Sequence, residues 1–92
     1  PLYLAEAAPA LTALVTAVDC GELAEATRLA HMLKSSSSML GATRMADLLR
    51  GIESAGRAGD LAEARRHAQH LGAEFERVQA AMAARRGEDR CA

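Results

Sequence analysis

The sequence predicts an all-α protein, an antiparallel up-down-up-down bundle of four helices. Half of its residues are apolar, aromatic residues make up only 2%, and apolar residues recur at steps of three and four. Abundant alanine favours helices, whereas the aromatic residues that favour sheets are scarce. Short connections between amphipathic segments favour antiparallel neighbours. The 92 residues are enough for one domain with a modest core.

The first predicted helix carries its apolar stripe from Leu4 to Val18. Pro9 lies inside this pattern, where a proline either kinks a helix or marks its true start. The sequence Asp-Cys-Gly at 19–21 then predicts a short turn.

The second predicted helix extends from Leu23 to Leu40 and ends at Gly41, a residue that tolerates positive φ. Four consecutive serines at 35–38 lower its helix propensity and would ordinarily suggest a loop. Periodicity alone leaves both alternatives open. A continuous helix is favoured because the spacing from Leu33 to Leu40 stays in phase through the serines.

The third and fourth helices complete the bundle. Thr43 is the expected N-cap of the third, and Gly56 and Gly59 close it. Asp60 and Glu63 form a D-x-x-E pattern that resembles a capping box, and one continuous helix follows, with its apolar spacing kept as far as residue 82. We expect the bundle to occupy residues 1–86, with a polar tail at 87–92 that is a frayed end or the start of a linker.

Composition and charge exclude several function classes. The net charge of −1 leaves no basic excess for nucleic acid or for contact of this domain with a membrane. No apolar run approaches the ~20 residues of a membrane span, so we expect a cytoplasmic domain, although its parent protein can still be membrane-anchored. Cys20 and Cys91 indicate neither a disulfide framework nor a zinc site. The start at Pro1, without an initiator methionine, suggests a piece of a longer protein.

A motif in the second helix carries the functional information. Residues 30–42 read Ala-His-Met-Leu-Lys-Ser-Ser-Ser-Ser-Met-Leu-Gly-Ala. This stretch resembles the signature of histidine-containing phosphotransfer (Hpt) domains of two-component phosphorelays, roughly H-x-x-K-G-S-x-x-x-L-G-A. The resemblance continues through residues 45–48, 52–53, 57–60 and 74–78. The short N-terminal helix that often covers one end of such bundles has no counterpart here.

The resemblance implies a phosphorelay intermediate in which His31 projects into solvent from the middle of the second helix. It would accept a phosphoryl group reversibly from the aspartate of a response-regulator receiver domain and pass it on. The implied partners are receiver domains and a parent hybrid histidine kinase. The domain would be a phosphocarrier without kinase activity or a cofactor of its own, because the chain has no glycine-rich phosphate loop and Mg²⁺ would come with the receiver.

The helical spacing places Thr27, Lys34, Ser35 and Ser38 on the same polar side as His31. Lys34, the only lysine of the chain, lies one turn beyond His31, where its ammonium can offset phosphoryl charge. Ser35 replaces the usual glycine of the family. Its side chain either hinders the approach of a partner or donates a hydrogen bond to a phosphoryl oxygen.

A receiver domain would dock on the surface around His31. Small side chains keep that face flat, and methionines give it an adaptable apolar rim. In some relatives a polar residue and an arginine of the third helix lie near the histidine, and by offset these are Glu53 and Arg57. The alternative is an exposed i,i+4 ion pair. We assign charge stabilisation to Lys34, Ser35 and Arg57, and docking to Thr27, Arg28, Met32, Ser38, Met39, Ala42 and Glu53.

Other interpretations remain open at this point. A helical interaction module without phosphotransfer is the main alternative, and Ser35 favours it. A dimeric histidine-kinase phosphoacceptor hairpin would want an acidic residue after the histidine, where this chain has Met32. His67, His70 and Glu74 have a spacing compatible with a metal, but further converging ligands are missing, so we expect a solvated polar face and no metal site.

Overall fold

The computed structural model describes the backbone of residues 2–39 and 42–91 and the side chains of residues 6–39 and 42–83. Its elements, in chain order, are the helices α1 (Leu2–Asp19), α2 (Leu23–Met39), α3 (Thr43–Ala58), α4 (Leu61–Ala68) and α5 (Leu71–Cys91). No strand occurs in this described part of the chain. The predicted all-α fold is confirmed.

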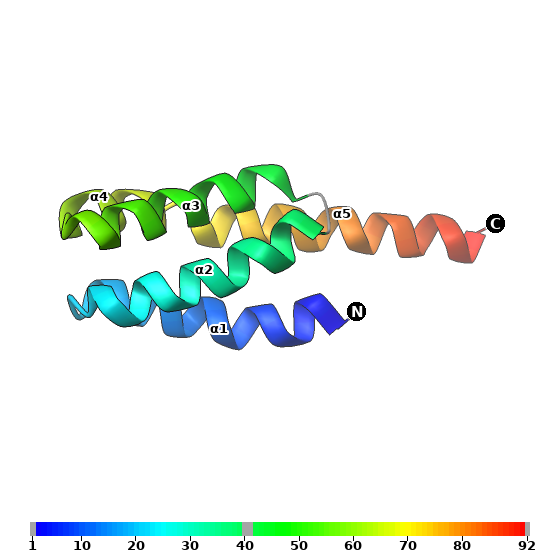
Figure 1. The fold of residues 1–92 in the computed structure, drawn as a ribbon. Helices are drawn as coiled ribbons and strands as arrows, with labels where there is room; N and C mark the ends of the chain where they lie inside the picture. Colours follow the sequence, from blue (N-terminus) through cyan, green and yellow to red (C-terminus); the bar gives the residue numbers. More distant parts are fainter. Residues whose placement is uncertain (1, 40–41, 92) are drawn as a thin grey trace.

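The helices lie side by side with alternating direction (Figure 1). The second helix packs between α1 and α3, and α4 followed by α5 returns along α3, so this pair together forms the fourth member of the bundle. The molecule is elongated, with principal extents of 49 × 19 × 18 Å, because the C-terminal half of α5 projects beyond the other helices.

The fourth bundle member is interrupted, which the sequence did not predict. α4 ends at Ala68 and α5 begins at Leu71, and in the turn between them the His70 N–H donates to the His67 carbonyl oxygen at 3.1 Å. This bond spans three residues instead of four, so it tightens the chain locally. Ala64 before the turn and Leu71 after it are nevertheless both fully buried, which explains why the apolar spacing shows no break.

Glycines follow the ends of two helices, as predicted, but Gly56, which we also expected to close the third helix, lies within α3. Gly21 and Gly59 adopt left-handed φ values of 78° and 72°. After α3 the Gly59 N–H donates to the Gly56 carbonyl at 3.2 Å and the Asp60 N–H donates to the Ala55 carbonyl at 2.8 Å. These are the two bonds of a Schellman motif, which satisfies carbonyls that a helix end leaves without intrahelical partners.

The N-caps that the sequence predicts are only partly correct. Thr43 is not the N-cap of α3: Ala42 is, because its carbonyl already accepts the first helical hydrogen bond, from the Ala46 N–H at 3.0 Å. Asp60 does cap α4, and its side chain accepts the Glu63 N–H at 3.0 Å. The helical course of α1 continues through Pro9.

The serine stretch is helical, because α2 runs to Met39. Ser37 lies on the buried face of this helix with 0% exposure. Leu40 and Gly41, where we placed the end of the helix, lie outside the described residues. The continuous-helix alternative is therefore correct as far as the structure describes α2.

The core is built from aliphatic side chains of all the helices. Leu14, Leu49, Ile52 and Leu71 are completely inaccessible to solvent, and Met45 is 2% exposed. Phe75 is the one aromatic residue of the described core. Close helix packing compensates for the shortage of large side chains.

The expected polar tail is helical as far as the structure describes it. α5 continues to Cys91, since arginine and glutamate sustain a helix that is already formed. The domain boundary at residue 86 stays a prediction. None of the described helices is long and apolar enough to cross a membrane.

Candidate functional site

The site centres on His31, which lies in the middle of α2 with 61% of its side chain exposed. The neighbouring Ala30 and Leu33 are buried, so one face of the helix packs inward while the imidazole stands in solvent. The predicted exposure of His31 is confirmed.

Glu53 of α3 is the residue that the other side chains of the site contact, and only 4% of its side chain is exposed. Its Oε2 lies 2.8 Å from Nδ1 of His31, and its Oε1 accepts a hydrogen bond from Nζ of Lys34 at 2.8 Å. Arg57, one turn further along α3, donates to Oε2 at 2.7 Å. One buried carboxylate therefore contacts three basic side chains from two helices.

These contacts determine the charge of the carboxyl group. The hydrogen bond from Lys34 lowers the pKa of Glu53 below its usual value, and the His31 hydrogen bond and the Arg57 charge act in the same direction. Burial opposes them by raising the pKa, but the net direction is downward. Glu53 is consequently ionised at neutral pH and can only accept hydrogen bonds.

Because the ionised Glu53 can only accept hydrogen bonds, it determines the tautomer of His31. Because Oε2 of Glu53 cannot donate, Nδ1 of the imidazole must carry the proton in their 2.8 Å contact. In the neutral ring Nε2 then holds the unshared electron pair. The hydrogen-bond network thus leaves Nε2 as the nitrogen with the free electron pair in the neutral form of this exposed ring.

Glu53 and Arg57 do lie near the histidine, which confirms one of the two interpretations of this pair. The i,i+4 ion pair of the other interpretation also forms, but only its arginine is exposed, at 69%, while Glu53 is buried. Assigning Glu53 to docking is corrected for the same reason: a buried carboxylate presents almost no surface. The contact between Lys34 and Glu53 joins residues 19 positions apart, so no local pattern predicted it.

The remaining predicted residues divide between surface and interior. Thr27 is half-buried, its hydroxyl donates to the Leu23 carbonyl at 2.7 Å, and its side chain faces Gly56 of α3. Ala42 is half-buried against the core. Ser35 is exposed, with its Oγ 3.5 Å from the His31 carbonyl oxygen. The other docking residues share an exposed face with His31; they are Arg28, Met32 (46% exposed), Ser38 and Met39 (87% exposed).

Comparison with known families supports what the geometry suggests. The family model described as "Hpt domain" matches residues 2–81. The chain belongs to the Hpt domain family. No curated protein and no solved structure matches it.

Membership of the Hpt family settles the broad function. Hpt domains take part in phosphotransfer within phosphorelays and interact there with receiver domains. They are phosphocarriers and not kinases, and they need no cofactor of their own.

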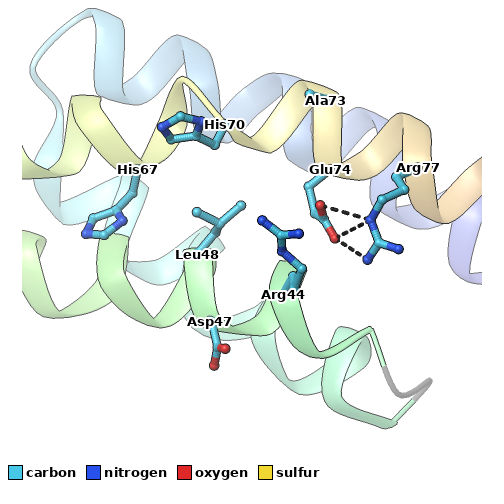
Figure 2. A pocket seen from close by; sticks show the side chains of 8 residues that line it. All are labelled: Arg44, Asp47, Leu48, His67, His70, Ala73, Glu74 and Arg77. Atoms are coloured by element: carbon cyan, nitrogen blue, oxygen red, sulfur yellow. Dashed lines mark hydrogen bonds and ion pairs between the residues drawn. The ribbon is translucent and has the colours of Figure 1, made fainter.

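A second polar cluster lines a groove of about 550 Å³ between α3 and the α4–α5 pair (Figure 2). Glu74 is only 8% exposed there, so the expected solvated face is wrong for this residue. Arg77 donates to its carboxylate at 2.5 to 3.2 Å and lowers its pKa. His67 instead contacts Glu63 at 2.9 Å. No group of three potential metal ligands converges among the described residues.

Proposed function

We propose that this Hpt domain accepts a phosphoryl group on Nε2 of His31 from the aspartyl phosphate of a receiver domain and passes it to another receiver aspartate. One observation carries the proposal: Oε2 of the ionised Glu53 lies 2.8 Å from Nδ1 of His31 and accepts its proton in a hydrogen bond, so the electron pair of the neutral, exposed imidazole is at Nε2. An unprotonated, accessible nitrogen is the nucleophile that this transfer requires.

In the forward step the Nε2 electron pair attacks phosphorus, and a nitrogen–phosphorus bond forms as the bond to the aspartate oxygen breaks. The electrons of the broken bond leave on the aspartate carboxylate. The ring becomes positively charged while Nδ1 keeps its proton, and the adjacent Glu53 carboxylate stabilises this charge. The reverse step uses the same atoms, so phosphate flow in either direction fits.

Basic side chains beside the ring offset the charge of the transferred group. Lys34 is 26% exposed, lies one turn beyond His31 and contacts Oε1 of Glu53. Arg57 contacts the other carboxylate oxygen, Oε2. Charge neutralisation and positioning are the main contributions a protein makes to phosphoryl transfer. We assign Mg²⁺ to the receiver. We propose that the Ser35 hydroxyl donates an additional hydrogen bond to a phosphoryl oxygen.

The exposed methionines and small side chains around His31 form the proposed receiver-docking face. Met32 and Met39 supply flexible apolar surface, and Ser35 and Ser38 add little bulk. The same face would serve whether the domain acts alone or within a hybrid histidine kinase.

The test is transfer of radiolabelled phosphate from a phosphorylated receiver. We expect acid-labile, base-stable label on the wild-type domain and on His70→Gln, which changes an exposed histidine in the turn after α4. His31→Gln should abolish the label while circular dichroism shows an intact helical fold. Undiminished labelling of His31→Gln would overturn the site. Absence of label on all three proteins would favour the interaction module without phosphotransfer.

A further inference from the structure

α2 and α3 approach each other unusually closely at Thr27 and Gly56. A Cβ atom added at Gly56 would lie 1.9 Å from Oγ1 of Thr27 and 3.2 Å from its Cβ. Contacts under 3.0 Å essentially never occur for a real Cβ, so a side chain at residue 56 requires something to move. The absence of a side chain at Gly56 sets the spacing of the two helices.

This contact lies next to the proposed phosphorylation site. Thr27 precedes His31 by one turn on α2, and Gly56 follows Glu53 by three residues on α3. Since the two helices run in opposite directions, the Thr27–Gly56 contact lies one turn from the His31–Glu53 hydrogen bond.

The side chain of Thr27 is poorly able to yield. Its hydroxyl donates to the Leu23 carbonyl at 2.7 Å, and a β-branched side chain has few rotamers in a helix. Its Cβ is also fixed by the backbone. A larger residue at position 56 is therefore accommodated chiefly by moving α3 away from α2.

We propose that Gly56 is a positioning residue for phosphotransfer, because it brings α3 close enough for Glu53 to reach both His31 and Lys34. The distance between the added Cβ and Thr27 Oγ1 must increase from 1.9 Å to the 3.4 Å of ordinary van der Waals contact, so α3 must move outward. The two 2.8 Å bonds of Glu53 would then exceed hydrogen-bonding distance. The effect on transfer rests on the proposed function, whereas the effect on the hydrogen bond does not.

The test compares Gly56→Ala with wild type by two measurements. Nitrogen-15 NMR of the unphosphorylated domain should show loss of the Nδ1-protonated preference of His31, and carbon-13 NMR should show the pKa of Glu53 rising as its donors withdraw. Transfer from a phosphorylated receiver should slow by roughly 10- to 100-fold, the effect expected for misplacement by about 1 Å.

Two further variants separate positioning from general destabilisation. Gly72→Ala makes the same substitution on α5, where a Cβ meets nothing within 4 Å, and should leave both NMR signatures and the transfer rate unchanged. Combining Gly56→Ala with Thr27→Ala removes the clashing hydroxyl and should restore the His31 tautomer and most of the rate.

The outcomes are distinguishable. If Gly56→Ala keeps the His31 tautomer and the Glu53 pKa, the Thr27 side chain has yielded instead, and the proposal is wrong. If Gly56→Ala does not fold, Thr27→Ile enlarges the same contact from α2 and should produce the same NMR changes; wild-type signatures there also overturn it. A wild-type domain that accepts no phosphate refutes the proposed function, while the NMR comparison still decides the role of Gly56.

Discussion

Glu53 is the residue that determines the tautomer of His31 in this structure. A buried charge is costly unless it is paired and hydrogen-bonded, and here two cations and one imidazole N–H satisfy it. The same carboxylate fixes the ring tautomer and holds Lys34 beside it. In the proposed reaction, a single side chain thus prepares both the nucleophile and its electrostatic surroundings.

Replacing Lys34 with alanine tests the electrostatic part of this arrangement. Its hydrogen bond is the largest influence lowering the pKa of Glu53, and Lys34 follows His31 by three residues on the same helix. We expect phosphotransfer to slow on the order of 100-fold, as when one charge-stabilising donor is removed from an active site. The rate is measured from a time course of His31 labelling by a phosphorylated receiver, quenched at successive times.

Arg50→Ala is the matched control, because Arg50 is an exposed cation paired with Asp47 on α3. It should transfer phosphate at the wild-type rate. Equal rates for Lys34→Ala and wild type would remove Lys34 from the mechanism.

The sequence predicted the residues of the site better than their roles. His31 and Lys34 lie within one turn of one helix, so a local motif was enough to identify them. The burial of Glu53 and the inward orientation of Thr27 depend on how α2 and α3 face each other. Contacts between helices follow from tertiary packing, which no local pattern in the sequence encodes.

At the scale of elements, the ends of the helices determine where the chain reverses. The Schellman motif at Gly59 and the side-chain cap at Asp60 reverse the chain between α3 and α4 within two residues. The sequence predicted both, because they use residues with strong conformational preferences. It missed the turn at 69–70, where neither residue is a glycine or a proline and the buried spacing continues.

Removing the cap of α4 should cost a defined amount of stability. Asp60→Ala leaves the Glu63 N–H without its side-chain acceptor, and we expect the free energy of unfolding to fall by about 1 kcal/mol. Urea denaturation followed by circular dichroism measures it.

Asp47→Ala provides the comparison, since it removes only an exposed i,i+3 ion pair with Arg50. We expect a loss of no more than about 0.5 kcal/mol there. Equal losses in the two variants would show that Asp60 contributes no capping.

The whole molecule combines a small aliphatic core with two buried carboxylates. Domains of this length have unfolding free energies of about 5 to 14 kcal/mol, so the protonation of either carboxylate is consequential. The pKa of Glu53 is lowered chiefly by Lys34 and that of Glu74 chiefly by Arg77. Both groups connect the stability of the fold to pH.

The sign of this linkage follows from the lowered pKa values. A carboxyl group that binds its proton less readily when folded contributes stability above its unfolded pKa, near 4.5, and loses that contribution as pH falls through the folded value. We therefore expect the wild-type free energy of unfolding to decline steadily below about pH 4.5. Urea denaturation across pH 3 to 7 measures this decline.

Glu53→Gln cannot titrate at that position, so it should be less stable than wild type at pH 7 and show a shallower decline in acid. Glu76→Gln changes an exposed carboxylate of α5 and should keep the wild-type profile. Parallel profiles for wild type and Glu53→Gln would contradict the linkage.

The bond between Glu53 and His31 also affects the entropy of an encounter. Its two ends sit on packed helices and not on loops, so the ring has lost much of its rotational freedom before any partner arrives. Ordering a free side chain at an interface costs about 0.5–1.5 kcal/mol, and that cost is met here during folding. A docking receiver then meets an imidazole that is already oriented, so this side chain adds little to the ordering cost of binding.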